Sequence, residues 1–245
     1  MPLQLVHTQV EGKRVTFCVN MERDPVQRNH RKGTFYELKA LAALRNVFPD
    51  NGVFVDIGAN VGNHSLYAAL FLNARRVIPF EPNPRAYDLL IQNVLVNRLE
   101  TVFDLSNLGV GVSDAAMSGF AMEERDRNLG AARMLPGEGS LSVVKGDEVL
   151  SGESPDFIKI DVEGMEMRVL SGLEQTLQRC SPVLLIEVDN TVEDAFFDWA
   201  DAQGYGLVFT HQRYKTNKNH VIAPKDRLPA LRSHFVGTGM ETKAR

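Results

Sequence analysis

The sequence predicts an α/β protein in which a mostly parallel β-sheet is covered by helices on both faces. From residue 53 onward, short runs rich in β-branched residues alternate with longer segments of helical periodicity. Several of the short runs are apolar at every position, which is typical of strands buried on both faces of a parallel sheet. Before this repeat, two alternating runs at residues 4–10 and 13–19 predict a short N-terminal β-hairpin.

The chain is expected to form a single domain, with residues 1–33 as the hairpin and a cover and residues 34–245 as the core. Core strands are expected at residues 53–57, 76–81, 101–105, 109–112, 157–161, 183–188 and 207–210, with a last one near 235–237. Helices, marked by apolar residues at helical spacing, are expected at residues 63–73, 84–98, 165–179 and 192–202. Residues 123–140 are polar and glycine-rich, and are expected to form a mobile loop that either binds a ligand or is a disordered excursion.

Composition excludes several classes of protein. The 245 residues include 24% charged and 44% hydrophobic residues, with a formal net charge of −4. These values are typical of a globular protein, and they lack the basic surplus of a nucleic-acid-binding protein. Neither a signal peptide nor an apolar run of about 20 residues is found, so we expect a cytoplasmic protein without a nucleic-acid or membrane partner. The oligomeric state stays open.

A glycine-rich turn follows the first core strand and points to a nucleotide-like cofactor. Its residues are Gly58-Ala59-Asn60-Val61-Gly62, and Asp56 comes just before them. Glycines at such a turn let the backbone approach a cofactor closely, although packing alone also explains them. A carboxylate here would repel a pyrophosphate and attract the α-ammonium of S-adenosylmethionine (SAM). The next two residues, Asn63 and His64, open the following helix and are further candidate cofactor contacts.

An acidic residue ends the second core strand. Glu81 stands in the segment Phe80-Glu81-Pro82-Asn83-Pro84, where a carboxylate accepts both ribose hydroxyls of an adenosine. It would serve NAD and SAM equally, and Asn83 is a second candidate contact beside it. The alternative role for Glu81 is an acid placed just upstream of a helix that Pro84 opens.

Charged residues gather where two later strands end. Lys159, Asp161 and Glu163 lie at or just past one strand, and Glu187 and Asp189 end the next. Strand periodicity turns Lys159 and Asp161 to the same side. Ligands of open α/β sheets bind at this carboxyl edge, and buried charges are costly unless they are paired or functional. The edge is therefore either an acidic active site or a solvated rim.

These motifs together resemble the FkbM-type SAM-dependent methyltransferases over roughly residues 34–210. The resemblance is carried by the segments Asp56–Gly62, Glu81–Pro84, Lys159–Glu166 and Pro182–Glu187. It implies a Rossmann-like class I methyltransferase fold with a seven-stranded sheet, and methyl transfer mainly to hydroxyls of sugars or natural products. It also implies that Asp56, Gly58, Asn60, Gly62 and Glu81 contact the cofactor and that Asp161 and Glu163 belong to the active site. One departure is Gly146-Asp147, where the family usually has an apolar residue before the aspartate.

The expected mechanism places a base beside the acceptor hydroxyl, which is a poor nucleophile at neutral pH. We expect Asp161 to be that base, or to orient the acceptor together with Lys159 and Glu187. A variant of the mechanism uses Asp161, Glu187 and Asp189 as ligands of Mg²⁺. Two other functions stay open: a non-catalytic SAM- or nucleotide-binding module, and an NAD(P)-dependent oxidoreductase. Asp56 and the absence of a third glycine disfavour the oxidoreductase.

The methyl acceptor, a small molecule or a sugar, is expected to bind among three variable segments, residues 20–36, 123–140 and 211–225. The basic residues of these segments would meet an acidic group on the acceptor or would simply be solvated: Arg125, Arg127, Arg133, Arg213, Lys215 and Lys218. Tyr36 and Glu37 precede the first core strand. They would either close over the methionine end of SAM or pack within a helix.

Overall fold

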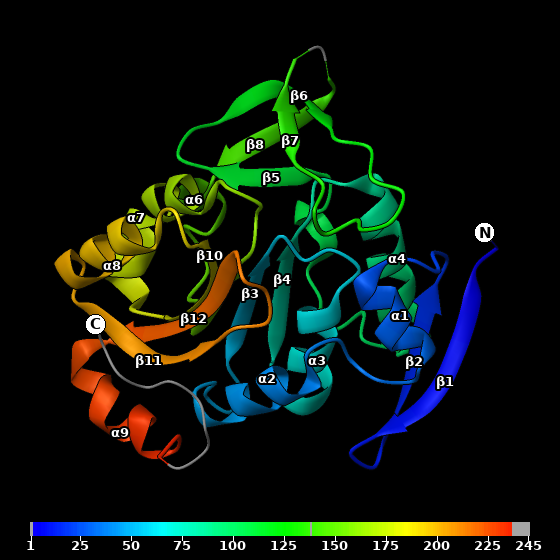
Figure 1. Cartoon of the computed structure of the whole chain (residues 1–245), viewed down its shortest axis with the longest axis horizontal. Coiled ribbons are helices and arrows are strands. Elements are labelled where there is room, and N and C mark those ends of the chain that lie inside the picture. Colours follow the sequence, from blue (N-terminus) through cyan, green and yellow to red (C-terminus); the bar gives the residue numbers. More distant parts are fainter. Residues whose placement is uncertain (1, 138, 237–245) are drawn as a thin grey trace.

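The centre of the molecule is a six-stranded sheet, seen in a computed structural model that describes residues 2–137 and 139–236 (Figure 1). The strand order is β11-β12-β10-β9-β3-β4. The four parallel strands are β3 (Val53–Ile57), β4 (Arg76–Phe80), β9 (Phe157–Ile160) and β10 (Val183–Asp189). Two antiparallel strands, β12 (Asn217–Pro224) and β11 (Tyr205–His211), complete the sheet beside β10. The prediction of a mostly parallel sheet is confirmed.

Smaller sheets flank this centre. β1 (Gln4–Val10) and β2 (Lys13–Val19) form the N-terminal hairpin with the predicted bounds. β5 (Val110–Ser113), β6 (Met117–Met122), β7 (Met134–Pro136) and β8 (Leu141–Lys145) form a four-stranded sheet, at the top of Figure 1. The loop expected over residues 123–140 therefore includes one strand of that sheet, β7.

Helices cover both faces of the central sheet, as predicted. The helices of the described residues are α1 (Pro25–Arg31), α2 (Leu38–Ala43), α3 (Asn63–Phe71), α4 (Pro84–Val96), α5 (Gly146–Val149), α6 (Glu166–Gly172), α7 (Glu174–Cys180), α8 (Glu193–Ala202) and α9 (Leu228–Ser233). The helix expected over residues 165–179 is divided into α6 and α7 at Leu173.

The two faces of the sheet build two separate cores. Phe54 and Phe157 pack with Leu66 and Tyr67 of α3 in one buried cluster. Residues of the opposite parity, such as Val55 and Ile160, pack with side chains of α6, α7 and α8 in a second cluster. Because side chains alternate along a strand, Asp56 and Lys159 are placed on the α3 face of the sheet, within reach of the carboxyl edge.

Three strand predictions need correction. The strand expected at residues 109–112 is β5, which lies in the separate four-stranded sheet and not in the central one. The strand expected at residues 101–105 forms isolated parallel bridges beside β4, Val77–Phe103 and Glu81–Leu108, because the 3₁₀ turn Leu105–Asn107 interrupts it. The central sheet therefore has six strands in place of the expected seven. The last strand expected near residues 235–237 is wrong for 235 and 236, which follow α9, and residue 237 lies outside the described part of the chain. Within the described residues the last strand is β12, whose polar start Asn217-Lys218-Asn219 conceals its strand pattern.

The unusual Gly146-Asp147 pair has a structural role. Both carboxylate oxygens of buried Asp147 accept hydrogen bonds at the start of α7, from the backbone N–H of Gln175 at 3.1 Å and of Thr176 at 2.8 Å. A Cβ at position 146 would lie 2.6 Å from Leu173 Cδ2, so glycine is the residue that fits there. Asp147 therefore caps the start of α7, and Gly146 leaves room for Leu173.

The described helices were also compared with the length and hydropathy that a membrane crossing requires. No helix in residues 2–137 and 139–236 meets both requirements.

Candidate active site

The glycine turn after β3 packs directly against the end of β9. Gly58 has a φ of +79°, and a Cβ at this position would lie 1.8 Å from the carbonyl oxygen of Asp161. Any side chain at position 58 would therefore separate the two strand ends. Two residues later, Asn60 is left-handed (φ 52°) and donates its backbone N–H to Glu81 Oε2 at 2.7 Å. The turn thus connects the ends of β3, β4 and β9.

Glu81 is buried at the end of β4, where its carboxylate faces a cavity. Its Oε1 accepts the backbone N–H of Asn83 at 2.8 Å, while Oε2 accepts that of Asn60. Burial raises the pKa of Glu81 to about 7, although these two hydrogen bonds oppose the shift. Asn83 itself caps α4, since its Oδ1 accepts the backbone N–H of Arg85 at 3.1 Å.

The first cavity holds about 620 Å³ of space, including its open mouth. Ligand pockets usually measure about 300–1,000 Å³. Its polar wall is formed by Gly58, Asn60, Glu81, Asp161 and Glu163. Its apolar wall includes Ile57, Phe80, Val112, Met122, Leu129, Ala132, Met134, Val162 and Met165. The cavity therefore combines a hydrogen-bonding side with a wide apolar surface.

A chain of buried charges lies beneath the turn. The Lys159 ammonium donates to the Gly58 carbonyl at 2.6 Å and lies 3.3 Å from Asp56 Oδ1 and 3.4 Å from Asp161 Oδ2. Fully buried Asp56 also accepts the Ser65 hydroxyl at 2.6 Å. Burial by itself lowers the pKa of Lys159, but the charges of Asp56 and Asp161 raise it above its ordinary value. Lys159 therefore stays protonated and holds the Asp161 carboxylate in place. Asp56 itself does not line the first cavity.

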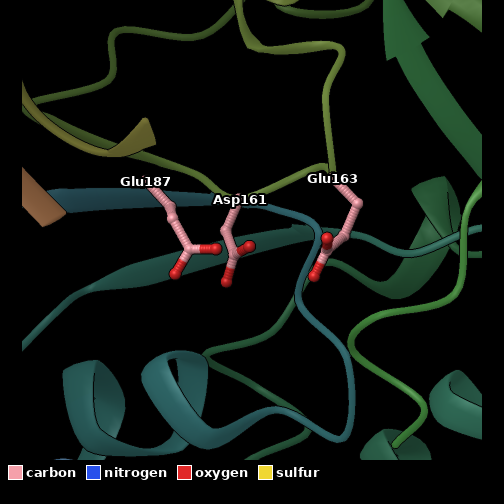
Figure 2. Close-up of side chains that lie close together, drawn as sticks. All are labelled: Asp161, Glu163 and Glu187. Atoms are coloured by element: carbon pink, nitrogen blue, oxygen red, sulfur yellow. The ribbon is translucent and has the colours of Figure 1, made fainter. Parts of the chain in front are cut away.

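Three carboxylates meet at the carboxyl edge, on the side chains of Asp161, Glu163 and Glu187. One oxygen of each lies within 4.8 Å of the others, and Figure 2 shows the three side chains extending in the same direction. Burial and the charge of Asp161 raise the pKa of Glu163 to about 7 and that of Glu187 to about 9. Glu187 Oε1 also accepts a hydrogen bond from Asn217 Nδ2 at 2.7 Å.

Asp189 does not belong to this group, contrary to the expected metal-ligand set. It is exposed at the end of β10 and accepts hydrogen bonds from the backbone N–H and the hydroxyl of Thr191, at 2.8 and 2.6 Å. The third carboxylate of the group is that of Glu163 instead. The backbone of Glu163 is left-handed (φ 55°) just after the end of β9.

The raised pKa of Glu187 leads to a pH-dependent stability. A carboxyl whose folded-state pKa of about 9 exceeds its ordinary 4.5 stabilises the fold below pH 4.5, and this contribution is lost as the pH rises through 9. Glu187→Gln should therefore raise the free energy of unfolding at pH 9.5 by about 1–3 kcal/mol relative to its effect at pH 5. Thermal unfolding from pH 5 to 9.5 tests this, with Asp198→Asn, at an exposed position of α8, as the charge-matched control. Parallel pH profiles for wild type and Glu187→Gln would refute it.

A second cavity adjoins the first and shares Asn60, Gly130, Asp161 and Glu163 with it. It holds about 900 Å³ of space, including its open mouth. All three segments expected to surround an acceptor line it, through Pro25, Val26, Tyr36, Asn128, Gly130, Ala131, Tyr214, Asn217 and Asn219. Glu187 and His64 complete its inner wall, and burial lowers the pKa of His64 to about 4, so this imidazole is neutral.

Asn63 and Gly62, two further residues expected to contact the cofactor, make contacts within the protein. Asn63 is buried, accepts the backbone N–H of Tyr36 at 3.0 Å and donates to the Tyr36 carbonyl at 3.1 Å. It thereby ties the N-terminal segment to α3. Gly62 begins that helix with a φ of +88°, and a Cβ there would lie 3.1 Å from Leu90 Cγ. Among the expected site residues, those that line neither cavity are Asp56, Gly62, Asn63, Asn83 and Lys159.

The turn between β11 and β12 supplies Tyr214, a cavity residue that the sequence did not single out, beside the expected Arg213. The hydroxyl of Tyr214 lies 2.9 Å from that of Tyr36, and the Arg213 guanidinium lies 4.2 Å from the centre of the Tyr36 ring. Arg213 also lies 3.9 Å from Glu37, whose pKa burial raises to about 7. The signal that would have found this turn is the strand pattern of β12, which its polar first residues conceal.

The basic residues of the variable segments do not line the second cavity. Arg125 pairs with Glu123 at 2.9 Å, and Lys218 pairs with Glu193 at 2.8 Å. Arg127, Arg133 and Lys215 are exposed. The expectation that these six residues meet an acidic acceptor therefore finds no support in the cavity wall.

Comparison with known proteins gives the family. The model of the family described as the methyltransferase FkbM domain matches residues 56–205, which is more than half of the chain. A hexuronic acid methyltransferase of Haloferax volcanii is 30% identical over 56% of this chain and 56% of its own length. A methyltransferase of Beauveria bassiana is 28% identical over 52% of this chain and 60% of its own length. The chain thus aligns with less than two thirds of either relative.

A solved structure supports the fold. An rRNA methylase from Streptococcus thermophilus superposes with a TM-score of 0.50 at 14% identity, covering 76% of this chain and 94% of that one. At this identity the likeness concerns the Rossmann-like methyltransferase fold alone, and it confirms the predicted fold class. Because the family model spans the glycine turn, the Glu81 corner and the three-carboxylate edge, the chain belongs to the FkbM methyltransferase domain family.

Proposed function

We propose that the protein transfers a methyl group from SAM to a hydroxyl oxygen of a small hydroxylated acceptor such as a sugar. The observation that carries the proposal is the junction of the two cavities, where Asn60, Asp161 and Glu163 line both. One cavity suits an adenosine and the other is open to an acceptor. Family membership supports methyl transfer from SAM, and the relative named for hexuronic acid supports a sugar as acceptor.

The residues of the first cavity fit SAM. Each carboxylate oxygen of Glu81 has a lone pair left beyond its backbone hydrogen bond, so it has capacity for the ribose hydroxyls. The apolar wall offers a surface for an adenine ring. At the junction, Asn60 Oδ1 is buried without a hydrogen-bond partner among the described residues. A buried orphan acceptor is costly, and an ammonium or hydroxyl donor from a ligand would satisfy it.

The chemistry then depends on residues of the carboxyl edge. Bound SAM supplies an electrophilic methyl group on a positively charged sulfur. Asp161 accepts the proton of the acceptor hydroxyl as the new oxygen–carbon bond forms and the sulfur–carbon bond breaks. Lys159 holds Asp161 in place from below at 3.4 Å, so it is a positioning residue. Glu187 and Glu163 orient further hydroxyls of the acceptor.

Binding measurements separate this proposal from its alternatives. Calorimetry should show that SAM and S-adenosylhomocysteine bind and NAD does not. Glu81→Gln should weaken SAM at least about tenfold, because it removes a charged acceptor from the ribose. The exposed variant Asp198→Asn serves as control. Binding of NAD in place of SAM would favour the oxidoreductase, and an unchanged affinity in Glu81→Gln would remove Glu81 from the cofactor site.

A tritiated-methyl transfer assay over hydroxylated acceptors separates an enzyme from a non-catalytic binding module. Product carrying the label is expected, and its hydrolytic stability identifies an ether rather than an ester. SAM binding without any labelled product across the acceptors would favour the non-catalytic module.

A metal-assisted form of the reaction would use the same carboxylates. Asp161, Glu163 and Glu187 satisfy the distance requirement for shared oxygen ligation of Mg²⁺, which would lower the pKa of an acceptor hydroxyl. We expect the base mechanism, because Lys159 already compensates Asp161. Dialysis against EDTA should then leave the transfer rate within about twofold. A loss that Mg²⁺ restores would favour the metal form.

A further inference from the structure

We propose that the second cavity selects its acceptor by charge, preferring a hydroxylated acceptor with a protonated amine over a neutral one and excluding acidic acceptors. This inference rests on the proposed function and names the acceptor class for the same site. An amino sugar or amino polyol is the chemistry that fits.

The walls of the second cavity supply one sign of charge. Four carboxylates line it, on Glu37, Asp161, Glu163 and Glu187, whereas no lysine or arginine is among its lining residues. The other polar groups are amides and hydroxyls, and the His64 imidazole is neutral. A ligand in this cavity therefore meets carboxyl groups and no lining cation. Asp161 carries its charge beside Lys159, whereas the raised pKa values of about 7 for Glu37 and Glu163 and about 9 for Glu187 keep Glu187 mostly protonated near pH 7.5.

The nearby cations are already committed elsewhere. Lys159 lies under the floor, shared between Asp56 and Asp161. Arg213 lies over the Tyr36 ring and pairs with Glu37. Arg125 and Arg133 are exposed and do not line the second cavity, although their charges lower the pKa of Glu163 slightly against its overall rise. The two close cations, Lys159 and Arg213, thus face five carboxylates when Asp56 is included.

The raised pKa values of the cavity carboxyl groups indicate how the site would respond to a charged ligand. Burial and the charge of Asp161 raise the pKa values of Glu37, Glu163 and Glu187, so each added negative charge is already costly there. An acidic group on the acceptor would add to this repulsion. A protonated amine would relieve it and would find carboxylate oxygens as hydrogen-bond partners.

Three other features indicate a polyhydroxylated ligand. Tyr36 and Tyr214 meet through their hydroxyls and place two aromatic rings at the cavity. Asn217 and Asn219, on one face of β12, add amide donors and acceptors opposite Glu187. At the boundary with the first cavity, the orphaned Oδ1 of Asn60 requires a donor. Aromatic faces combined with convergent amides and carboxylates suit a sugar ring that carries several hydroxyls.

The test uses three acceptors that differ only at C6: methyl glucoside, its 6-amino-6-deoxy analogue and methyl glucuronoside. Binding to the protein loaded with S-adenosylhomocysteine is measured by calorimetry at pH 7.5 and low salt, and transfer rates from SAM are measured in parallel. We expect the amine to bind at least about tenfold more tightly than the neutral sugar, and the acid to bind at least about tenfold more weakly. Raising the salt concentration should reduce both ratios.

Glu37→Gln removes one wall charge and should narrow the ratio between amine and acid about three- to tenfold. Asp198→Asn, which removes an exposed charge on α8, should leave the ratio unchanged. Equal or tighter binding of the glucuronoside would overturn the proposal, as would an unaltered ratio in Glu37→Gln. If none of the three sugars binds while S-adenosylhomocysteine does, the acceptor class is wrong but the proposed function stands. If S-adenosylhomocysteine itself fails to bind, the proposed function and this inference both fail.

Discussion

Asp161→Asn should lower the rate of methyl transfer by about 10²–10⁴-fold while SAM still binds. The variant keeps the shape of the side chain but removes the negative charge that accepts the acceptor proton. Asp161 is suited to this role because it lines both cavities and lies 3.4 Å from the fixed ammonium of Lys159.

Single-turnover transfer of the tritiated methyl group, together with calorimetry of SAM, measures the two effects separately. Asp198→Asn is the control for a loss of carboxylate far from the cavities. Undiminished transfer by Asp161→Asn would show that another carboxylate, or none, acts as the base.

Lys159→Met should destabilise the fold by about 3–5 kcal/mol, the typical effect of leaving a buried charge without its partner. Asp56 is fully buried, and among the described residues its carboxylate accepts the Ser65 hydroxyl and pairs with Lys159. The Gly58 carbonyl would also lose its hydrogen bond from the ammonium at 2.6 Å. The glycine turn after β3 would then lack its hydrogen bond to the end of β9.

Denaturant unfolding at pH 7.5 measures this loss, and the double variant Lys159→Met/Asp56→Asn tests its cause. If the uncompensated charge of Asp56 is responsible, the double variant should recover at least about 1 kcal/mol of the loss. A loss of unfolding free energy below about 1 kcal/mol in Lys159→Met would contradict the stabilising role of Lys159. A double variant less stable than Lys159→Met would contradict it as well.

The sequence predicted the framework well because the relevant signals are local. The hairpin bounds and the common orientation of Lys159 and Asp161 follow from a two-residue period, whereas the parallel strands follow from runs that are apolar at every position. A strand of the central sheet was expected at residues 101–105, but Asp104 accepts the Ser106 backbone N–H and begins a 3₁₀ turn. A local side-chain hydrogen bond thus prevented the extension of a ladder.

The make-up of the acid group could not be predicted in the same way. Glu187 and Asp189 have the same strand parity, so the sequence does not distinguish them. The register does: Ile186 pairs with Ile160, which places Glu187 level with Asp161 and leaves Asp189 two residues further out, about 7 Å along the strand. Glu163 was expected in the active site but not among the metal ligands; it lies beside Asp161 with a left-handed backbone (φ 55°).

The place of Asp56 also depends on a long-range contact. Its position before the glycine turn suggested a direct contact with the cofactor, which the family resemblance also implies. The side chain instead turns under the strand ends toward Lys159 and Ser65, from β9 and α3. Asp56 thus acts on the site through Lys159 and the turn.

The most direct test of the two-cavity arrangement is a crystal structure of the protein with S-adenosylhomocysteine. We expect the ribose hydroxyls on the Glu81 carboxylate, the adenine against the apolar wall that includes Val112 and Met165, and the sulfur at the junction beside Asp161. Electron density for the ligand elsewhere, or a sulfur directed away from the second cavity, would contradict it.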